Sequence, residues 1–152
     1  MLGSVCLGVP GVIAYRPIVL RVVAEACVLF LGPPWEHAHG HVDVQQGELF
    51  QHELLSAVGE AFNNITFHGY SGMAPGAVAI EIQWTLHEIS IALSDTGLRF
   101  DPSRIEPPML DSMPERGMGL FIMRSCLDEL DYQPGPPNVL RMIKRRRFEG
   151  RP

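Results

Sequence analysis

The residues best suited to chemistry lie between Glu60 and His68, on a segment whose apolar residues recur with helical spacing. Glu60, Asn64 and His68 are each four residues apart, so we expect them to line one side of a helix. A carboxylate and a carboxamide held one turn apart can share a reaction, in which the carboxylate accepts a proton and the carboxamide oxygen coordinates a hard cation. The alternative interpretation is a polar helix face exposed to solvent.

Two glycine-containing motifs follow this helix. Asp95-Thr96-Gly97 comes directly after an apolar strand, where the aspartate could accept a hydrogen bond from an exocyclic amine and the glycine could let a flat ring approach the backbone. Gly117-Met118-Gly119 precedes a helix, and free N–H groups at a helix N-terminus attract phosphate. Each motif alone is also typical of ordinary turns and helix starts. The Walker-type lysine loop and the longer dinucleotide fingerprint are both absent from the sequence.

Hydrophobic periodicity predicts the elements that must position these residues. In chain order we expect a strand at Val5–Val9, a helix that Pro17 opens, a helix from about Glu48 to His68, strands at Val78–Trp84 and Ile89–Leu93, a helix from Gly117–Gly119 that closes at Asp128–Tyr132, and a strand at Val139–Lys144. Residues 102–116 are rich in proline and charge without periodicity, which is typical of a lid. This order predicts an α+β, two-layer sandwich in which helices cover one face of a mixed, mostly antiparallel sheet.

Length and composition predict one compact domain over residues 1–152, with 46% hydrophobic and 19% charged residues. The net charge of −5 argues against a general nucleic-acid binder. The basic run Lys144–Arg147 is interpreted as a solvated strand end, with a nucleic-acid role as the weaker alternative. Charges and prolines interrupt the apolar first thirty residues, so we expect neither a membrane span nor a targeting segment there.

Two groups of potential metal ligands, the cysteines and a set of histidines, lack the sequence pattern that is typical of a metal site. The three cysteines, Cys6, Cys27 and Cys126, are scattered among apolar residues, so we expect buried, reduced thiols in a cytoplasmic protein. Three alternating histidines lie in the linker after the first helix, at His37, His39 and His41. They are interpreted as part of a polar surface loop, with a metal site as the alternative.

The order of the three motifs is more specific than any one of them. A Glu-x-x-x-Asn helix, an Asp-x-Gly after a strand and a Gly-x-Gly before a helix together resemble the GHKL ATPase superfamily, and within it the anti-sigma factor serine/threonine kinases. The segments that carry the resemblance are SAVGEAFNNITFHGY (56–70), LSDTGLRFDP (93–102), ERGMGLFIM (115–123) and DELDY (128–132). It extends roughly from Pro17 to Arg147 and implies the Bergerat ATP-binding fold of that superfamily.

The resemblance implies ATP and Mg²⁺ as cofactors and assigns roles to particular residues. Asn64 would bind the Mg²⁺ ion that bridges the phosphates, and Glu60 would be the general base that takes the proton from a serine or threonine hydroxyl. Asp95 would bind the adenine amino group, and Gly97 would make room for the ring.

The same resemblance extends to the residues around the lid. Gly117 and Gly119 would let the lid and the third helix close around the phosphates. Arg116, at the end of the lid, is our own candidate for contacting the terminal phosphate. His68 matches a recurrent residue of the branch, to which we assign only packing at the helix end.

The implied function is an ATP-dependent protein serine/threonine kinase that acts as an anti-sigma factor or partner-switch regulator. Its substrate would be a STAS-domain antagonist (an anti-anti-sigma protein), and a sigma factor would be a second partner. A homodimer is also implied, with the apolar first strand and helix as a candidate face. Two alternatives stay open: a nucleotide-gated binding module without kinase activity, and a kinase that phosphorylates a STAS scaffold of a stress-signalling complex.

The sequence departs from the family pattern at two places. Glu115-Arg116 occupies the region where a further glycine usually precedes the Gly-x-Gly. Pro137-Asn138 stands where many members have a Gly-Thr pair whose hydroxyl lies near the adenine. The Asn138 side chain could form a hydrogen bond in place of that hydroxyl.

Overall fold

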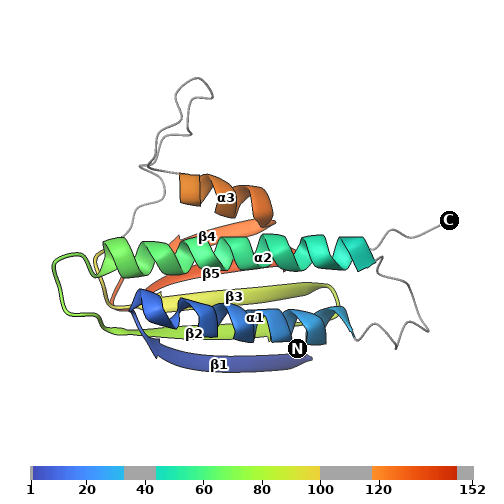
Figure 1. Cartoon of the computed structure of the whole chain (residues 1–152), viewed down its shortest axis with the longest axis horizontal. Coiled ribbons are helices and arrows are strands. Elements are labelled where there is room, and N and C mark those ends of the chain that lie inside the picture. Colours follow the sequence, from blue (N-terminus) through green and yellow to red (C-terminus); the bar gives the residue numbers. More distant parts are fainter. Residues whose placement is uncertain (1, 33–43, 100–117, 147–152) are drawn as a thin grey trace, which may run out of the picture.

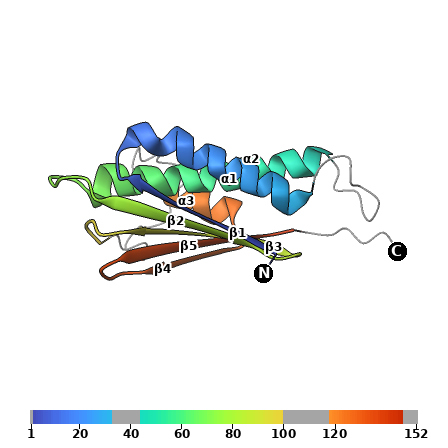
Figure 2. The same cartoon turned by 90° about the horizontal axis from the view of Figure 1, so that it is seen from below.

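The computed structural model describes residues 2–32, 44–99 and 118–146. The elements in chain order are β1 (Gly3–Pro10), the short 3-10 helix η1 (Ile13–Tyr15), α1 (Arg16–Leu31), α2 (Val44–Asn64), the π-helical turn η3 (Ile65–Gly69), β2 (Ala77–Trp84), β3 (Glu88–Asp95), α3 (Met118–Cys126), β4 (Glu129–Gln133) and β5 (Asn138–Arg145). Helices form one layer and strands the other (Figures 1 and 2). The predicted α+β two-layer architecture is confirmed.

The sheet has the strand order β1-β2-β3-β5-β4, and each of its four strand pairings is antiparallel. The sheet is therefore more regular than the mixed one we expected. In the β3–β5 pairing Ile91 lies opposite Met142 and Asp95 lies opposite Asn138. Directly opposed residues of an antiparallel pair present their side chains on the same face. The register thus places Asp95 and Asn138 together on the face that also carries the core.

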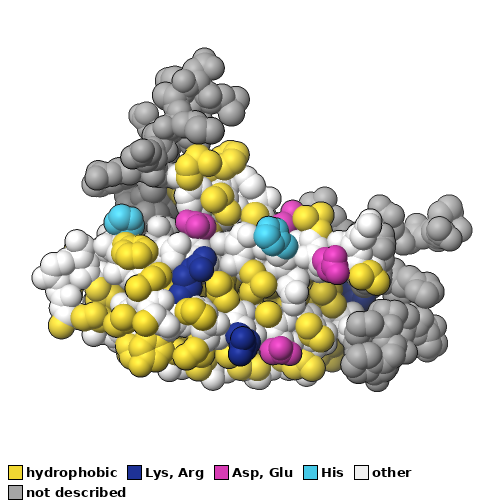
Figure 3. Space-filling model, in the orientation of Figure 1, with side chains coloured by type: hydrophobic (Ala, Val, Ile, Leu, Met, Phe, Trp, Pro, Cys, Tyr) yellow, Lys and Arg dark blue, Asp and Glu magenta, His cyan; other side chains and the backbone are white. Residues whose placement is uncertain are grey.

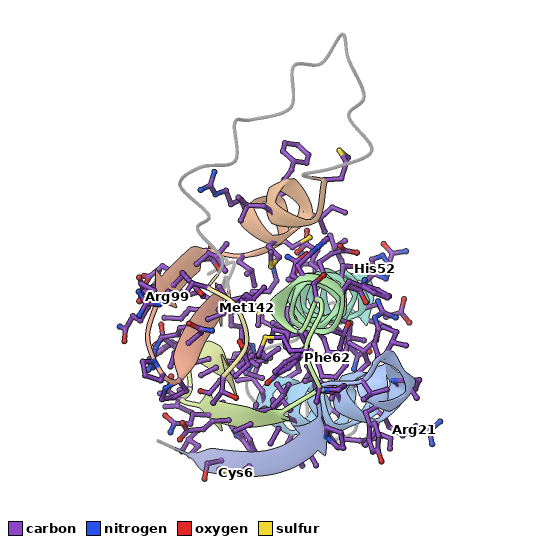
Figure 4. The ribbon with its side chains drawn as sticks, turned by 90° about the vertical axis from the view of Figure 1, so that its left-hand side faces the viewer. Cys6, Arg21, His52, Phe62, Arg99 and Met142 are labelled. Atoms are coloured by element: carbon purple, nitrogen blue, oxygen red, sulfur yellow. The ribbon has the colours of Figure 1, made fainter. Side chains whose placement is uncertain are left out.

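All three α-helices cover that face, and α2 packs between α1 and α3 (Figures 1 and 2). Alternate positions of the strands are buried beneath them, as period-two hydrophobicity predicts. Figure 4 shows Phe62 of α2 and Met142 of β5 in the layer between helix and sheet, and both side chains are fully buried. Pro17 lies in the first turn of α1, as predicted, and Gly32 ends that helix with a φ of 83°.

The predicted length of the last helix is wrong. Helix α3 ends at Cys126, and residues 129–133 form strand β4 along β5. Leu130 and Tyr132 alternate with the exposed residues Glu129, Asp131 and Gln133, which is a strand pattern. The i, i+3 spacing of Leu127 and Leu130 fits a helix equally well, and that ambiguity produced the error.

Helix α2 also differs from its prediction at both ends. It begins at Val44, earlier than Glu48, and regular α-helix ends at Asn64. The π-helical turn η3 continues the chain, so His68 does not follow Glu60 and Asn64 along one regular helix face, and its side chain is exposed. A π turn holds more residues per turn than an α-helix, which changes the direction of the residues after it.

Two predictions fall on residues outside the described ranges: the histidine-containing loop at residues 37–41 and the lid at residues 102–116. Within the ranges that the structure describes, no helix is both long enough and apolar enough to cross a lipid bilayer.

The three cysteines differ in their surroundings, and the prediction that all are buried is confirmed in full only for Cys27. Cys6 is exposed on β1 and points away from the helical layer (Figure 4). Cys27 is fully buried in α1, and this burial raises the pKa of its thiol to about 12. Cys126 is half-buried at the end of α3, where desolvation raises its thiol pKa.

This difference predicts the reactivity of the native thiols, because only the thiolate attacks a disulfide reagent. At pH 8 we expect Cys6 to react fastest with an aromatic disulfide such as Ellman's reagent, and Cys27 to react only after unfolding. The Cys6→Ser variant should lose the fast phase, whereas Cys27→Ser should keep it. A fast phase that survives Cys6→Ser would contradict the placement of β1 with this face outward.

Candidate functional site

The predicted site residues that the structure describes form two groups, one where β3 and β5 meet and one where the last turns of α2 meet α3. The first group lies where β3 ends and β5 begins. Asp95 is the last residue of β3 and Asn138 the first of β5, and their side chains are only 7% and 1% exposed. Both continue the rows of helix-facing residues on their strands, so period two places two polar side chains at the edge of an apolar core.

Hydrogen bonds fix the orientation of the Asp95 carboxylate. The backbone N–H of Gly97 donates to Asp95 Oδ1 at 2.7 Å, and Asn138 Nδ2 donates to the same oxygen at 3.2 Å. Asn138 Nδ2 also donates to the Gly97 carbonyl oxygen at 3.0 Å. Within the described residues no group donates to Asp95 Oδ2. The site therefore presents a carboxylate oxygen that can accept a hydrogen bond from a ligand.

Gly97 is held against the π-helical turn η3. The Leu98 N–H donates to the Gly69 carbonyl oxygen at 2.6 Å. A Cβ added at Gly97 would overlap that carbonyl group, lying 2.7 Å from its carbon. The absence of a side chain at Gly97 is therefore required by the protein's own backbone, whatever a ligand requires in addition.

The neighbouring Tyr70 ties the same turn to β2. Its hydroxyl accepts from the Thr96 N–H at 3.4 Å and donates to the Ala77 carbonyl oxygen at 3.3 Å. Sequence reasoning assigned no role to Gly69 or Tyr70, although both end the motif segment 56–70. Their partners Thr96, Gly97 and Leu98 lie 26 to 29 residues further along the chain, and no local pattern shows such contacts.

The second group consists of Glu60, Asn64 and Gly119. Glu60 and Asn64 are half-buried and lie one turn apart near the end of α2. Gly119 is in the first turn of α3, and a Cβ added there would lie 2.8 Å from Glu60 Oε2. The small residue thus lets the start of α3 approach the carboxylate. The structure brings Glu60 and Gly119 together across 59 positions of sequence.

The other end of α3 is held by a buried lysine. Lys144 Nζ donates to the Cys126 carbonyl oxygen at 2.6 Å and lies 2.7 Å from Glu53 Oε2. It also lies 5.1 Å from the centre of the Phe50 ring. A single cation thereby joins β5, α2 and the C-terminus of α3, where a positive charge is favourable.

Arg116 and Gly117 lie outside the described residues. Among the residues that are described, no three His, Cys, Asp or Glu side chains are grouped so that they could hold a metal ion. A divalent cation beside Asn64 could take further oxygen ligands from a bound substrate, which is how Mg²⁺ commonly binds with phosphates.

Comparison with known proteins identifies what the chain is similar to. Residues 35–144 match the family described as histidine kinase-like ATPase domain. The serine/threonine-protein kinase BtrW of Bordetella bronchiseptica is 35% identical over 84 residues, which cover 53% of this chain and 59% of that protein. Anti-sigma F factors of Clostridium beijerinckii and Clostridium novyi are 28% and 29% identical, over 70% and 71% of their lengths. The matched segments thus span only part of these relatives.

The contact between Gly97 and Gly69 predicts that Gly97→Ala destabilises the fold. We expect a loss of about 1–3 kcal/mol in the free energy of unfolding, because the added methyl group must displace backbone atoms. Denaturant titration would measure this loss. The control is Gly8→Ala on β1, where an added Cβ meets no atom within 4 Å. Equal stabilities of the two variants would contradict the close approach of the turn to Gly97.

The Lys144 contacts predict a second stability change. Replacing Glu53 with Gln removes the negative partner of a mostly buried ammonium group, and Glu53 itself is 33% exposed. We expect a loss of about 1–2 kcal/mol in the free energy of unfolding, less than for a fully buried pair. Glu25→Gln, at an exposed position of α1, is the matched control and should change stability by less than about 0.5 kcal/mol. If Glu53→Gln leaves the free energy of unfolding unchanged, the ion pair does not hold α3.

Proposed function

The chain belongs to the histidine kinase-like ATPase family, and on that premise we propose that it is an ATP-dependent protein serine/threonine kinase regulating a sigma factor or a related partner switch. The resemblance to the anti-sigma factor kinases is confirmed by the relatives described above. The observation that carries the kinase proposal is the position of Glu60. Its carboxylate lies against the first turn of α3 and one helical turn from Asn64.

In this proposal the first group of residues binds the adenine. The 6-amino group of adenine donates hydrogen bonds, and Asp95 Oδ2 is an acceptor that no described residue occupies. The buried Asp95 carboxylate is already oriented by Gly97 and Asn138 before any ligand arrives. Pre-oriented polar groups of this kind favour the ligand whose hydrogen-bonding pattern matches them.

The second group would act on the phosphates and on the protein substrate. The donor set fits Mg²⁺, because the Asn64 carboxamide offers one hard oxygen ligand and the nucleotide phosphates supply others. Bound there, Mg²⁺ would neutralise charge that develops on the phosphates. Glu60 would accept the proton of a serine or threonine hydroxyl as that oxygen bonds to the γ-phosphorus and the bond to ADP breaks. Such proton transfer contributes about 10²–10⁴-fold to rate.

The proposed partners are a STAS-domain antagonist as substrate, a sigma factor and a second copy of the chain. Figure 3 shows many apolar side chains on the helical face of the molecule. The exposed apolar residues of the helices include Ile18 and Leu29 of α1 and Phe121 of α3, which are 49%, 64% and 50% exposed. Exposed apolar surface of this kind supports protein binding and also the second candidate function, a nucleotide-gated binding module without kinase activity.

The test separates the two functions by replacing Glu60. With γ-labelled ATP, Mg²⁺ and a lysate of the native host, wild-type protein should label one small protein. Glu60→Gln should bind ATP within about threefold of wild type but transfer phosphate at least about 100-fold more slowly, since only the proton acceptor is lost. Glu25→Gln serves as a control for the charge change.

Three outcomes would revise the proposal. Retained phosphate transfer in Glu60→Gln would remove Glu60 as the base. Tight ATP binding that Asp95→Asn abolishes, without labelling of any protein, would favour the binding module. Failure of the wild-type protein to bind ATP would overturn both functions.

A further inference from the structure

The Asn138 side chain has no hydrogen left with which to bind a ligand. One hydrogen of its amide points to Asp95 Oδ1 and the other to the Gly97 carbonyl oxygen. Its own Oδ1 accepts from the Gly135 N–H at 3.2 Å. The residue is 1% exposed, so its polar groups are satisfied within the protein. Asn138 therefore has no free hydrogen for the hydrogen bond near the base that we expected from the sequence. It can still influence a ligand through Asp95, whose carboxylate it contacts.

We propose that Asn138 is a positioning residue that determines nucleotide selectivity, by occupying Asp95 Oδ1 and the Gly97 carbonyl so that the base meets Asp95 Oδ2 as an acceptor. The inference rests on the proposed function, in which Asp95 binds adenine. It adds a cause for the selectivity: one amide hydrogen of this buried side chain, together with the Gly97 N–H, fixes the rotation of the carboxylate, and the other amide hydrogen holds the Gly97 carbonyl.

The donors on Asp95 Oδ1 explain why the site favours a ligand that donates. Oδ1 already accepts hydrogens from Gly97 and Asn138, so Oδ2 is the oxygen left for a ligand. A carboxylate oxygen accepts and does not donate, so a purine with a 6-oxo group would face Oδ2 acceptor to acceptor. Adenine instead carries a 6-amino group, whose N–H can donate a hydrogen bond to Asp95 Oδ2. Sites that bind a substrate N–H in this way strongly reject analogues that lack it.

Changing Asn138 to Asp would reverse this polarity while keeping the size of the side chain. The new carboxylate could still accept from Gly135, but its other oxygen would face two acceptors, Asp95 Oδ1 and the Gly97 carbonyl. Two neighbouring carboxyl groups relieve this repulsion by sharing a proton or by moving apart. Either response frees Asp95 to rotate or lets it donate to a 6-oxo group, and selectivity for the 6-amino group falls.

The experiment measures Kd for ATP and for inosine triphosphate, which carries a 6-oxo group, by calorimetry with Mg²⁺ and the full chain. We expect wild type to bind ATP at least about tenfold more tightly than inosine triphosphate. In Asn138→Asp this ratio should fall below about threefold. The matched control is Gln133→Glu on β4, because Gln133 Nε2 also donates to an aspartate, Asp131 Oδ2, but at an exposed position. Its ratio should equal that of wild type.

A second pair of variants covers the case in which Asn138→Asp does not fold. Asn138→Thr and Asn138→Val have nearly the same shape and suit a strand, but only threonine can donate to Asp95 Oδ1. The threonine variant should keep most of the tenfold ratio and the valine variant should lose it. A purely structural role would weaken both nucleotides equally and leave the ratio unchanged, which would overturn the inference.

The outcomes also separate this inference from the proposed function. If wild type selects ATP and every Asn138 variant selects it equally well, only the role of Asn138 is wrong. If wild type binds ATP but does not discriminate, Asp95 does not bind the 6-amino group, and both the adenine assignment and this inference are overturned.

Discussion

The site depends on the contact between the end of α2 and the end of β3. Helix α2 crosses the sheet with its apolar face buried, and its position is fixed by residues such as Phe62 and Met142 between the two layers. The π-helical turn η3 at its end places the Gly69 carbonyl against Gly97. This contact fixes the Asp95 loop relative to Glu60 and Asn64, although the strand and the helix belong to different layers.

Helix α3 completes the second half of the site because it is attached at both of its ends. Lys144 holds the Cys126 carbonyl at its C-terminus, and Gly119 packs on Glu60 at its N-terminus. A carboxylate beside the first turn of a helix is in a favourable field, and the same field attracts the phosphates of a nucleotide. In the proposed kinase, the general base and the phosphate-binding helix are therefore positioned by one packing contact.

The order and type of most elements were predictable because their hydrophobic periods are strong. The strands β2 and β3 alternate cleanly, and α1 has proline in its first turn and glycine at its end. The strand β4 was not predictable, since its five residues carry only two apolar positions and follow a helix without a glycine or proline between them. The exposure of Cys6 was hidden by its apolar neighbours, because an edge strand buries only every second residue.

The sequence by itself determined the residue types at the site: a carboxylate and a carboxamide one turn apart, an Asp-x-Gly and a Gly-x-Gly in a fixed order. These are local patterns, and helix and strand periods act over a few residues. Only the tertiary structure decided which of them meet. The β3–β5 register places Asn138 beside Asp95 across 43 positions, and the packing of α3 on α2 places Gly119 beside Glu60. Contacts of this kind depend on how whole elements pack, which a short stretch of chain does not encode.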